Sequence, residues 1–127
     1  MNGQDTNILN NLVKQVHEDN LEAGWWKDPK TGEDLTDNVY VQCTKLALIH
    51  SELSEALEGL RKGKMDDHLQ HRKAVEVELA DTVIRILDLA GALKLDLGGA
   101  IAQKQAYNKQ RQDHKMANRA KEGGKAF

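Results

Sequence analysis

The chain has 127 residues and a formal net charge of -2, with 18 lysines and arginines against 20 aspartates and glutamates. This length predicts a single domain over residues 1–127 with one hydrophobic core, and the charge gives no reason to expect binding to nucleic acid or to an anionic membrane. The single cysteine excludes an intrachain disulfide, and no long apolar run or signal-like N-terminus is present, so we expect a soluble cytoplasmic protein.

An all-α fold is predicted, because the chain has one proline and is rich in alanine, leucine, glutamate and lysine. The first helix is expected from about Thr6 to Glu22. A turn-rich loop follows over residues 24–37. Its adjacent Trp25 and Trp26 leave two interpretations open: they cap the core, or they form a flat apolar wall for a nucleobase.

The second helix is predicted to begin near Asp37-Asn38, both good N-cap residues, and to end before Gly63. It carries Glu52 and Glu55, whose i, i+3 spacing puts both carboxylates on one helix face with Cβ atoms about 5–6 Å apart. A polar connection over residues 64–72 leads to the next helix.

The third helix is expected over residues 73–93, and it is apolar around nearly its whole circumference, which predicts burial on several sides. A narrow polar strip interrupts it at Glu78, Asp81, Arg85 and Asp88. Because a buried lone carboxylate is costly, these acids need a cation. At helical spacing Arg85 can serve Asp81 or Asp88, whereas Glu78 has no obvious cation on its own helix, and a metal would fill that deficit.

A fourth helix is predicted over residues 96–114. Its inward stripe passes from apolar side chains to Lys104, Asn108 and Arg111, so this end should face an anion inside the structure. The alternative is an ordinary solvated polar face at a helix end. The polar tail over residues 115–127 is expected to be mobile.

The two acidic pairs are the most informative feature of the chain. Glu52-x-x-Glu55 is followed, after 22 residues, by Glu78-x-x-Asp81. On facing helices these pairs would form a cage of carboxylates that repel one another, and a hard divalent cation would relieve that repulsion. Oxygen-only ligands favour Mg²⁺, with Mn²⁺ as a possible substitute, over zinc or copper. The alternative is a solvated acidic face, which charged helices produce by chance.

This pattern resembles the signature of the all-α nucleoside triphosphate pyrophosphohydrolase superfamily, and within it the MazG-like branch. The resemblance covers about residues 5–127 and includes three further segments. These are Gly24-Trp25-Trp26, similar to an aromatic loop of the group, Lys104-x-x-x-Asn108-x-x-Arg111, similar to its phosphate-binding segment, and Gly123-Gly124-Lys125, similar to the ending of its short members.

The resemblance implies a four-helix bundle assembled as a homodimer or as a dimer of dimers. It also implies Mg²⁺-dependent cleavage of a (deoxy)nucleoside triphosphate into the monophosphate and pyrophosphate, in a nucleotide-pool cleaning role. The metal ligands would be Glu52, Glu55, Glu78 and Asp81, and the substrate-binding residues would be Lys104, Asn108, Arg111, Lys125, Trp25 and Trp26. We expect Glu55 first, and Glu52 second, to position or deprotonate the attacking water.

Two alternative functions stay open. Phosphoribosyl-ATP pyrophosphohydrolase shares the acidic pattern, so the substrate could be that nucleotide. The chain could also be a non-catalytic helical module that self-associates or binds a partner protein, which the apolar third helix alone would explain. The sequence leaves base and sugar preference, the number of metal ions and the choice between dimer and tetramer open.

Overall fold

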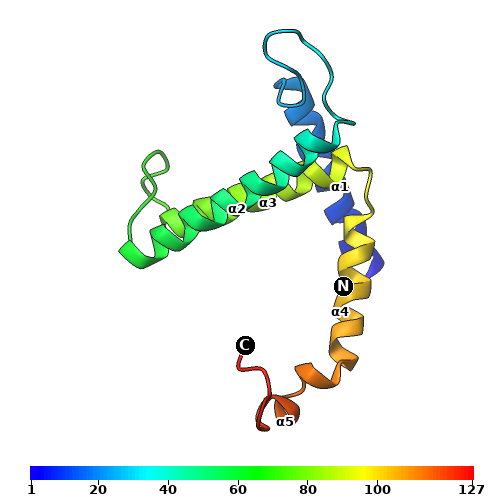
Figure 1. The fold of residues 1–127 in the computed structure, drawn as a ribbon, viewed down its shortest axis with the longest axis vertical. Helices are drawn as coiled ribbons and strands as arrows, with labels where there is room; N and C mark the ends of the chain where they lie inside the picture. The colour runs from blue at the N-terminus through cyan, green and yellow to red at the C-terminus, as the bar shows by residue number, and fades with distance from the viewer. The chain divides into compact units, whose positions relative to one another are not determined.

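The computed structural model describes residues 1–127 and is all-helical, which confirms the predicted all-α class (Figure 1). The helices are α1 (Gly3–Glu22), α2 (Val39–Lys62), α3 (Ala74–Ala92), α4 (Leu97–Gln110), the short 3₁₀ helix η1 (Gln112–His114) and α5 (Met116–Arg119). Extended pairing is limited to two isolated bridges, Lys27 with Asp34 and Met65 with Lys73. None of the helices combines the length and the hydropathy that crossing a membrane requires.

The chain divides into two compact units. The larger unit, residues 11–95, contains the second half of α1, the loop with the two tryptophans, α2 and α3. The smaller unit, residues 1–10 and 96–127, contains the start of α1 together with α4, η1 and α5. That the whole chain acts as one domain stays a prediction.

Helices α2 and α3 lie side by side as an antiparallel pair in the larger unit (Figure 1). Helix α2 begins where the sequence predicts, because Asn38 Oδ1 accepts two backbone N–H groups of the first turn at 3.0 and 3.2 Å. It ends at Gly63, whose φ of 59° lies in the left-handed region that favours glycine. The loop back to α3 is held by Asp66, whose carboxylate accepts the Leu69 N–H at 2.7 Å.

The core of the larger unit is built around a tryptophan from the loop. It comprises Trp26, Ile49, Leu89 and Ala92, with Val41 packed against them. Trp26 is the largest fully buried side chain, with 1% of its surface exposed. Helix α1 lies close to α3, because a Cβ added at Gly91 would overlap the His17 side chain.

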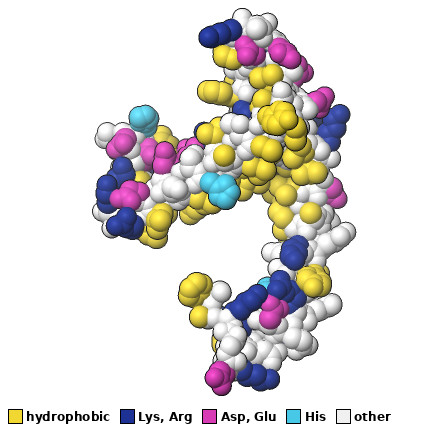
Figure 2. All heavy atoms as spheres, in the orientation of Figure 1, with side chains coloured by type: hydrophobic (Ala, Val, Ile, Leu, Met, Phe, Trp, Pro, Cys, Tyr) yellow, Lys and Arg dark blue, Asp and Glu magenta, His cyan; other side chains and the backbone are white.

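Helices α2 and α3 leave many apolar side chains uncovered within one chain. Their exposed fractions run from 38% to 65%, and Figure 2 shows hydrophobic side chains at the surface of this pair. The residues are Leu46, Leu53, Leu57, Leu60, Leu79, Val83, Ile84 and Ile86. The prediction that the third helix is buried on several sides is therefore wrong for the isolated chain, since its neighbours cover only part of its apolar circumference.

The smaller unit begins its long helix at a side-chain cap. Asp96 Oδ1 accepts the Gly99 N–H at 2.9 Å and the Asn10 side-chain amide at 2.7 Å. Helix α4 ends at Gln110 rather than near residue 114, because Arg111 adopts an extended conformation with φ -69° and ψ 129°. This turn separates α4 from η1.

The last residues are folded back by hydrogen bonds. The Arg119 guanidinium donates to the carbonyl oxygens of Lys125 at 3.2 Å and Ala126 at 2.5 Å. The Asn118 side-chain amide donates to the Gln112 carbonyl oxygen at 2.7 Å. These hydrogen bonds join the tail to η1 and to α5, and its expected mobility stays a prediction.

Candidate metal centre and adjoining cavity

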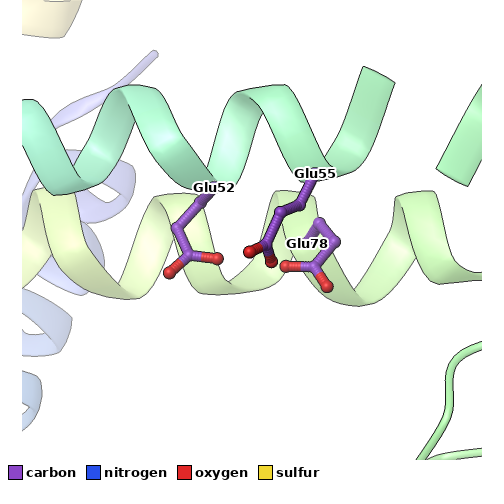
Figure 3. A group of neighbouring side chains, drawn as sticks. All are labelled: Glu52, Glu55 and Glu78. Atoms are coloured by element: carbon purple, nitrogen blue, oxygen red, sulfur yellow. The ribbon is translucent and has the colours of Figure 1, made fainter. Parts of the chain in front are cut away.

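Three glutamate side chains from two helices meet on one side of the α2–α3 pair. Glu52 and Glu55 extend from α2, and Glu78 extends toward them from α3 (Figure 3). One carboxylate oxygen from each lies within 4.8 Å of the others. The i, i+3 spacing on α2 and the antiparallel pairing of the helices together create this cluster. A set of hard carboxylate oxygens fits Mg²⁺ or Mn²⁺.

Glu78 is the member of the cluster whose ionised form is disfavoured. Burial, and after it the neighbouring Glu52 and Glu55 carboxylates, raise the pKa of Glu78 to about 7. A substantial share of Glu78 is therefore protonated near neutral pH. A bound divalent cation would relieve the same repulsion between carboxylates that the proton on Glu78 relieves. In this respect the charge of the site fits a metal ion.

Asp81, the fourth expected ligand, lies outside the cluster. It follows Glu78 along α3 and lines a cavity that Glu52 also lines. Burial raises the pKa of Asp81, the charge of Glu52 raises it further, and Arg85 partly opposes the shift. The structure therefore brings three of the four expected carboxylates together and places Asp81 beside them, where metal binding by Asp81 stays a prediction.

The prediction of the partner of Arg85 is wrong. Its Nε donates to Glu52 Oε1 at 2.7 Å, across from α3 to α2, instead of serving Asp81 or Asp88. Asp88 is held by other residues: its Oδ1 accepts the Trp26 Nε1–H at 2.9 Å and lies 2.8 Å from His17 Nδ1. Spacing along one helix identifies only neighbours on that helix, so the cross-helix pair could not be read from it.

The two tryptophans have different environments, which separates the two interpretations of the loop. Trp26 is in the core, so neither face of its ring is available to a nucleobase, and its assignment as a substrate-binding residue is corrected. Trp25 is 66% exposed and lines the cavity beside the cluster. Only Trp25 therefore remains a candidate for stacking.

The cavity in the larger unit has a volume of about 320 Å³. It is lined by Asn20, Trp25, Lys45, Leu48, Glu52, Asp81, Ile84, Arg85 and Asp88. Lys45 was missed by the sequence analysis. Its Nζ donates to the Trp25 carbonyl oxygen at 2.9 Å and lies 4.7 Å from the centre of the Trp26 ring. No spacing signal on α2 identifies Lys45, because both contacts are with the preceding loop.

Two of the expected phosphate-binding residues come together in the smaller unit. Arg111 donates to the Asp113 carboxylate from Nε at 3.0 Å and from Nη2 at 2.6 Å. Lys125 Nζ donates to the same carboxylate at 2.9 Å. The hydrogen bonds from Arg111, and then from Lys125, hold the pKa of Asp113 well below its usual range. Asp113 thus occupies an anion-binding site formed by Arg111 and Lys125, and no motif in the sequence predicts its role.

The other two expected phosphate-binding residues lie on α4. Lys104 is exposed, and its Nζ lies 4.8 Å from the centre of the Tyr107 ring. Asn108 Oδ1 is buried without a hydrogen-bond partner. Buried acceptors without a partner are uncommon in folded proteins. Because this oxygen has no partner in the chain, it can accept a hydrogen bond from a ligand hydroxyl or N–H.

Comparison of the chain with protein-family models, with curated proteins and with solved structures gave no match. The function of this chain must therefore be inferred from its own side chains. Three features can support this inference: the carboxylate cluster, the cavity, and the anion-binding site formed by Arg111 and Lys125.

Proposed function

We propose that the chain is a Mg²⁺-dependent nucleoside triphosphate pyrophosphohydrolase of the MazG-like, all-α type. It converts a (deoxy)nucleoside triphosphate into the monophosphate and pyrophosphate, in a nucleotide-pool cleaning role in the cytoplasm. The observation that carries this proposal is the meeting of Glu52, Glu55 and Glu78 within 4.8 Å, from two helices. The sequence resemblance supports it through the same acidic pairs and through three further segments.

The metal-binding residues in this proposal are Glu52, Glu55 and Glu78, with Asp81 as a further ligand. Mg²⁺ is the expected ion and Mn²⁺ a substitute, because all the donors are carboxylate oxygens. When bound, the ion supplies charge stabilisation to phosphate oxygens. The carboxylates contribute the negative charge that holds it.

Glu55 is proposed to orient the attacking water and to accept its proton. It is the exposed member of the cluster, so water reaches it most readily. Glu52 is the second choice, because only 9% of its surface is exposed and Arg85 already donates to its carboxylate. Phosphoryl transfer depends mainly on positioning and charge stabilisation, so a well-placed carboxylate is the principal requirement.

Lys104, Asn108, Arg111 and Lys125 are proposed to bind the phosphates and the sugar. The Asp113 carboxylate supports this role for Arg111 and Lys125, since it shows both cations donating to one anionic group. The planar guanidinium suits two-point contact with a phosphate as it does with a carboxylate. Substrate phosphate would compete with Asp113 for these donors.

The proposed assembly is a four-helix bundle that forms a homodimer or a dimer of dimers. The exposed apolar side chains of α2 and α3 support self-association, because contiguous apolar surface on a soluble chain marks an interaction site. The same surface favours the second candidate function, a non-catalytic helical module that self-associates. The two candidates differ in what the carboxylate cluster does.

Pyrophosphate release separates these functions. The assay covers the common ribo- and deoxyribonucleoside triphosphates and phosphoribosyl-ATP, with Mg²⁺, with Mn²⁺ and with a chelator. We expect metal-dependent release that Glu78→Gln abolishes. The matched control is Glu76→Gln on the same helix, since Glu76 is exposed and pairs with Arg72 at 2.8 Å.

Three results decide the assignment. Equal release by the wild type and by Glu78→Gln would remove the cluster from the reaction. Release from phosphoribosyl-ATP alone would give the chain that narrower activity. A chain that self-associates and releases no pyrophosphate from any of these substrates is the non-catalytic module.

A further inference from the structure

The cavity beside the carboxylate cluster is lined by aromatic, aliphatic and charged side chains. Trp25 is the aromatic one, and Leu48 and Ile84 are aliphatic. Asp88 is 5% exposed and lines the same cavity, so a buried carboxylate is part of the lining. At about 320 Å³ the cavity accommodates a flat heterocyclic ring.

The charges that line the cavity favour a neutral occupant. Three carboxylates, from Glu52, Asp81 and Asp88, stand against two cations, Arg85 and Lys45. Because Arg85 is paired with Glu52, an entering phosphate would meet two further carboxylates and only the Lys45 ammonium. A neutral ring that both donates and accepts hydrogen bonds meets no such repulsion.

Lys45 is the cation of the cavity that has no carboxylate partner, and it has hydrogen-bond donors to spare. An ammonium has three donors, and Lys45 uses one of them, on the Trp25 carbonyl oxygen at 2.9 Å. It forms no ion pair within salt-bridge distance, and its Nζ lies over the Trp26 ring, 4.7 Å from the ring centre. Burial lowers the pKa of Lys45, and the charge of Asp88 opposes that shift. Its ammonium is thus fixed in place and incompletely solvated.

We propose that this cavity is the nucleobase site and that Lys45 selects bases that carry a carbonyl oxygen. The ring would stack on Trp25, its carbonyl oxygen would accept from Lys45, and its N–H groups would face the Asp88 carboxylate. Uracil, thymine, cytosine and guanine have such an oxygen, and adenine has none. The inference rests on the proposed function for its biological meaning and extends it to a substrate preference.

Nucleoside binding tests the inference without hydrolysis, phosphate or metal. The full chain is titrated with uridine, cytidine, guanosine and adenosine, and the indole N–H signal of Trp25 is followed by NMR. The variants are Lys45→Met, which keeps a long apolar stem and loses the donors, and Lys45→Arg, which keeps a cation. Lys14→Met, at an exposed lysine of α1, is the matched control.

We expect the wild type to bind the three oxo-bearing nucleosides about ten-fold more tightly than adenosine, the size expected for a hydrogen bond to a charged donor. Lys45→Met should lose this difference, whereas Lys45→Arg and Lys14→Met should keep it. If Lys45→Met does not fold, Lys45→Leu, which also has no donor, replaces it, and the order of the four nucleosides on the wild type remains a test by itself.

The inference is overturned if no nucleoside shifts the Trp25 signal, if the wild type binds adenosine as tightly as the others, or if the neutral variant keeps the preference. These failures are distinct from a failure of the proposed hydrolase. A chain that binds bases in this order and releases no pyrophosphate would retain the base site and lose the hydrolytic function.

Discussion

Arg85 on α3 donates from Nε to Glu52 Oε1 on α2 at 2.7 Å, so this cation at the edge of the carboxylate cluster already has a carboxylate partner. The pair joins the two helices and balances the charge of a carboxylate that is largely buried. Glu55 and Glu78 have no cation of their own among the ion pairs of the chain. The deficit that a metal would fill therefore falls on those two side chains.

Replacement of Arg85 should destabilise the protein because it leaves the Glu52 carboxylate buried without a partner. We expect Arg85→Met to lower the free energy of unfolding by about 1–3 kcal/mol, as loss of a partner to a largely buried charge does. Urea unfolding of the metal-free protein measures this change. Arg61→Met is the matched control, since Arg61 forms an exposed pair with Glu58 and should change the stability by less than about 0.5 kcal/mol.

A double-mutant cycle refines that experiment. In the Glu52→Gln background, Arg85→Met should cost less, because no unpaired charge is left behind. Equal losses for Arg85→Met and Arg61→Met would show that the Glu52–Arg85 pair contributes nothing to stability.

The stability of the metal-free protein should fall as the pH rises through neutrality. The pKa of Glu78 is about 7 in the folded chain against an ordinary value of 4.5. The folded state therefore binds more protons than the unfolded state between these values, and the free energy of unfolding decreases with rising pH across that window. The contribution is fully present below 4.5 and is lost above about 7.

Urea unfolding at several pH values, with a chelator present, measures this slope. Glu78→Gln should show a shallower fall than the wild type, because the variant has no proton to lose at that position. A wild-type stability that is flat or rising across the window, or a slope unchanged in the variant, would contradict the assignment.

The two tryptophans should respond differently to truncation. Trp26→Ala should lower the free energy of unfolding by about 3–5 kcal/mol, because it opens a cavity in the core and removes a donor to the buried Asp88. Trp25→Ala should change it by less than about 0.5 kcal/mol, as expected for an exposed side chain. Chemical unfolding of the two variants checks this, and similar losses for both would place Trp25 in the core as well.

Local signals predicted much of the fold. The start of α2 at Asn38, its end at Gly63 and the shared face of Glu52 and Glu55 all depend on a few neighbouring residues, and the structure has each of them. The expected end of the fourth helix was too late, because the extended turn at Arg111 is stabilised by Asp113 in the 3₁₀ helix that follows.

The contacts between helices and loops could not be predicted from the sequence. The pairing of Arg85 with Glu52, the position of Lys45 against the loop and the burial of Trp26 instead of Trp25 depend on how helices and loop pack. Adjacent tryptophans give no signal that distinguishes the inward from the outward ring. The acidic pairs were found because their spacing is local, and their meeting across two helices was a hypothesis about packing.

Binding of Mn²⁺ to the full chain, followed by electron paramagnetic resonance and by paramagnetic broadening of NMR signals, tests most directly whether Glu52, Glu55 and Glu78 hold a divalent cation. We predict binding that Mg²⁺ displaces, that broadens the backbone signals of Glu55 and Glu78 most strongly, and that Glu78→Gln abolishes. Glu58→Gln, on the same helix as Glu55 but outside the cluster, should bind as the wild type does. Undiminished Mn²⁺ binding by Glu78→Gln, or none by the wild type, would contradict the account.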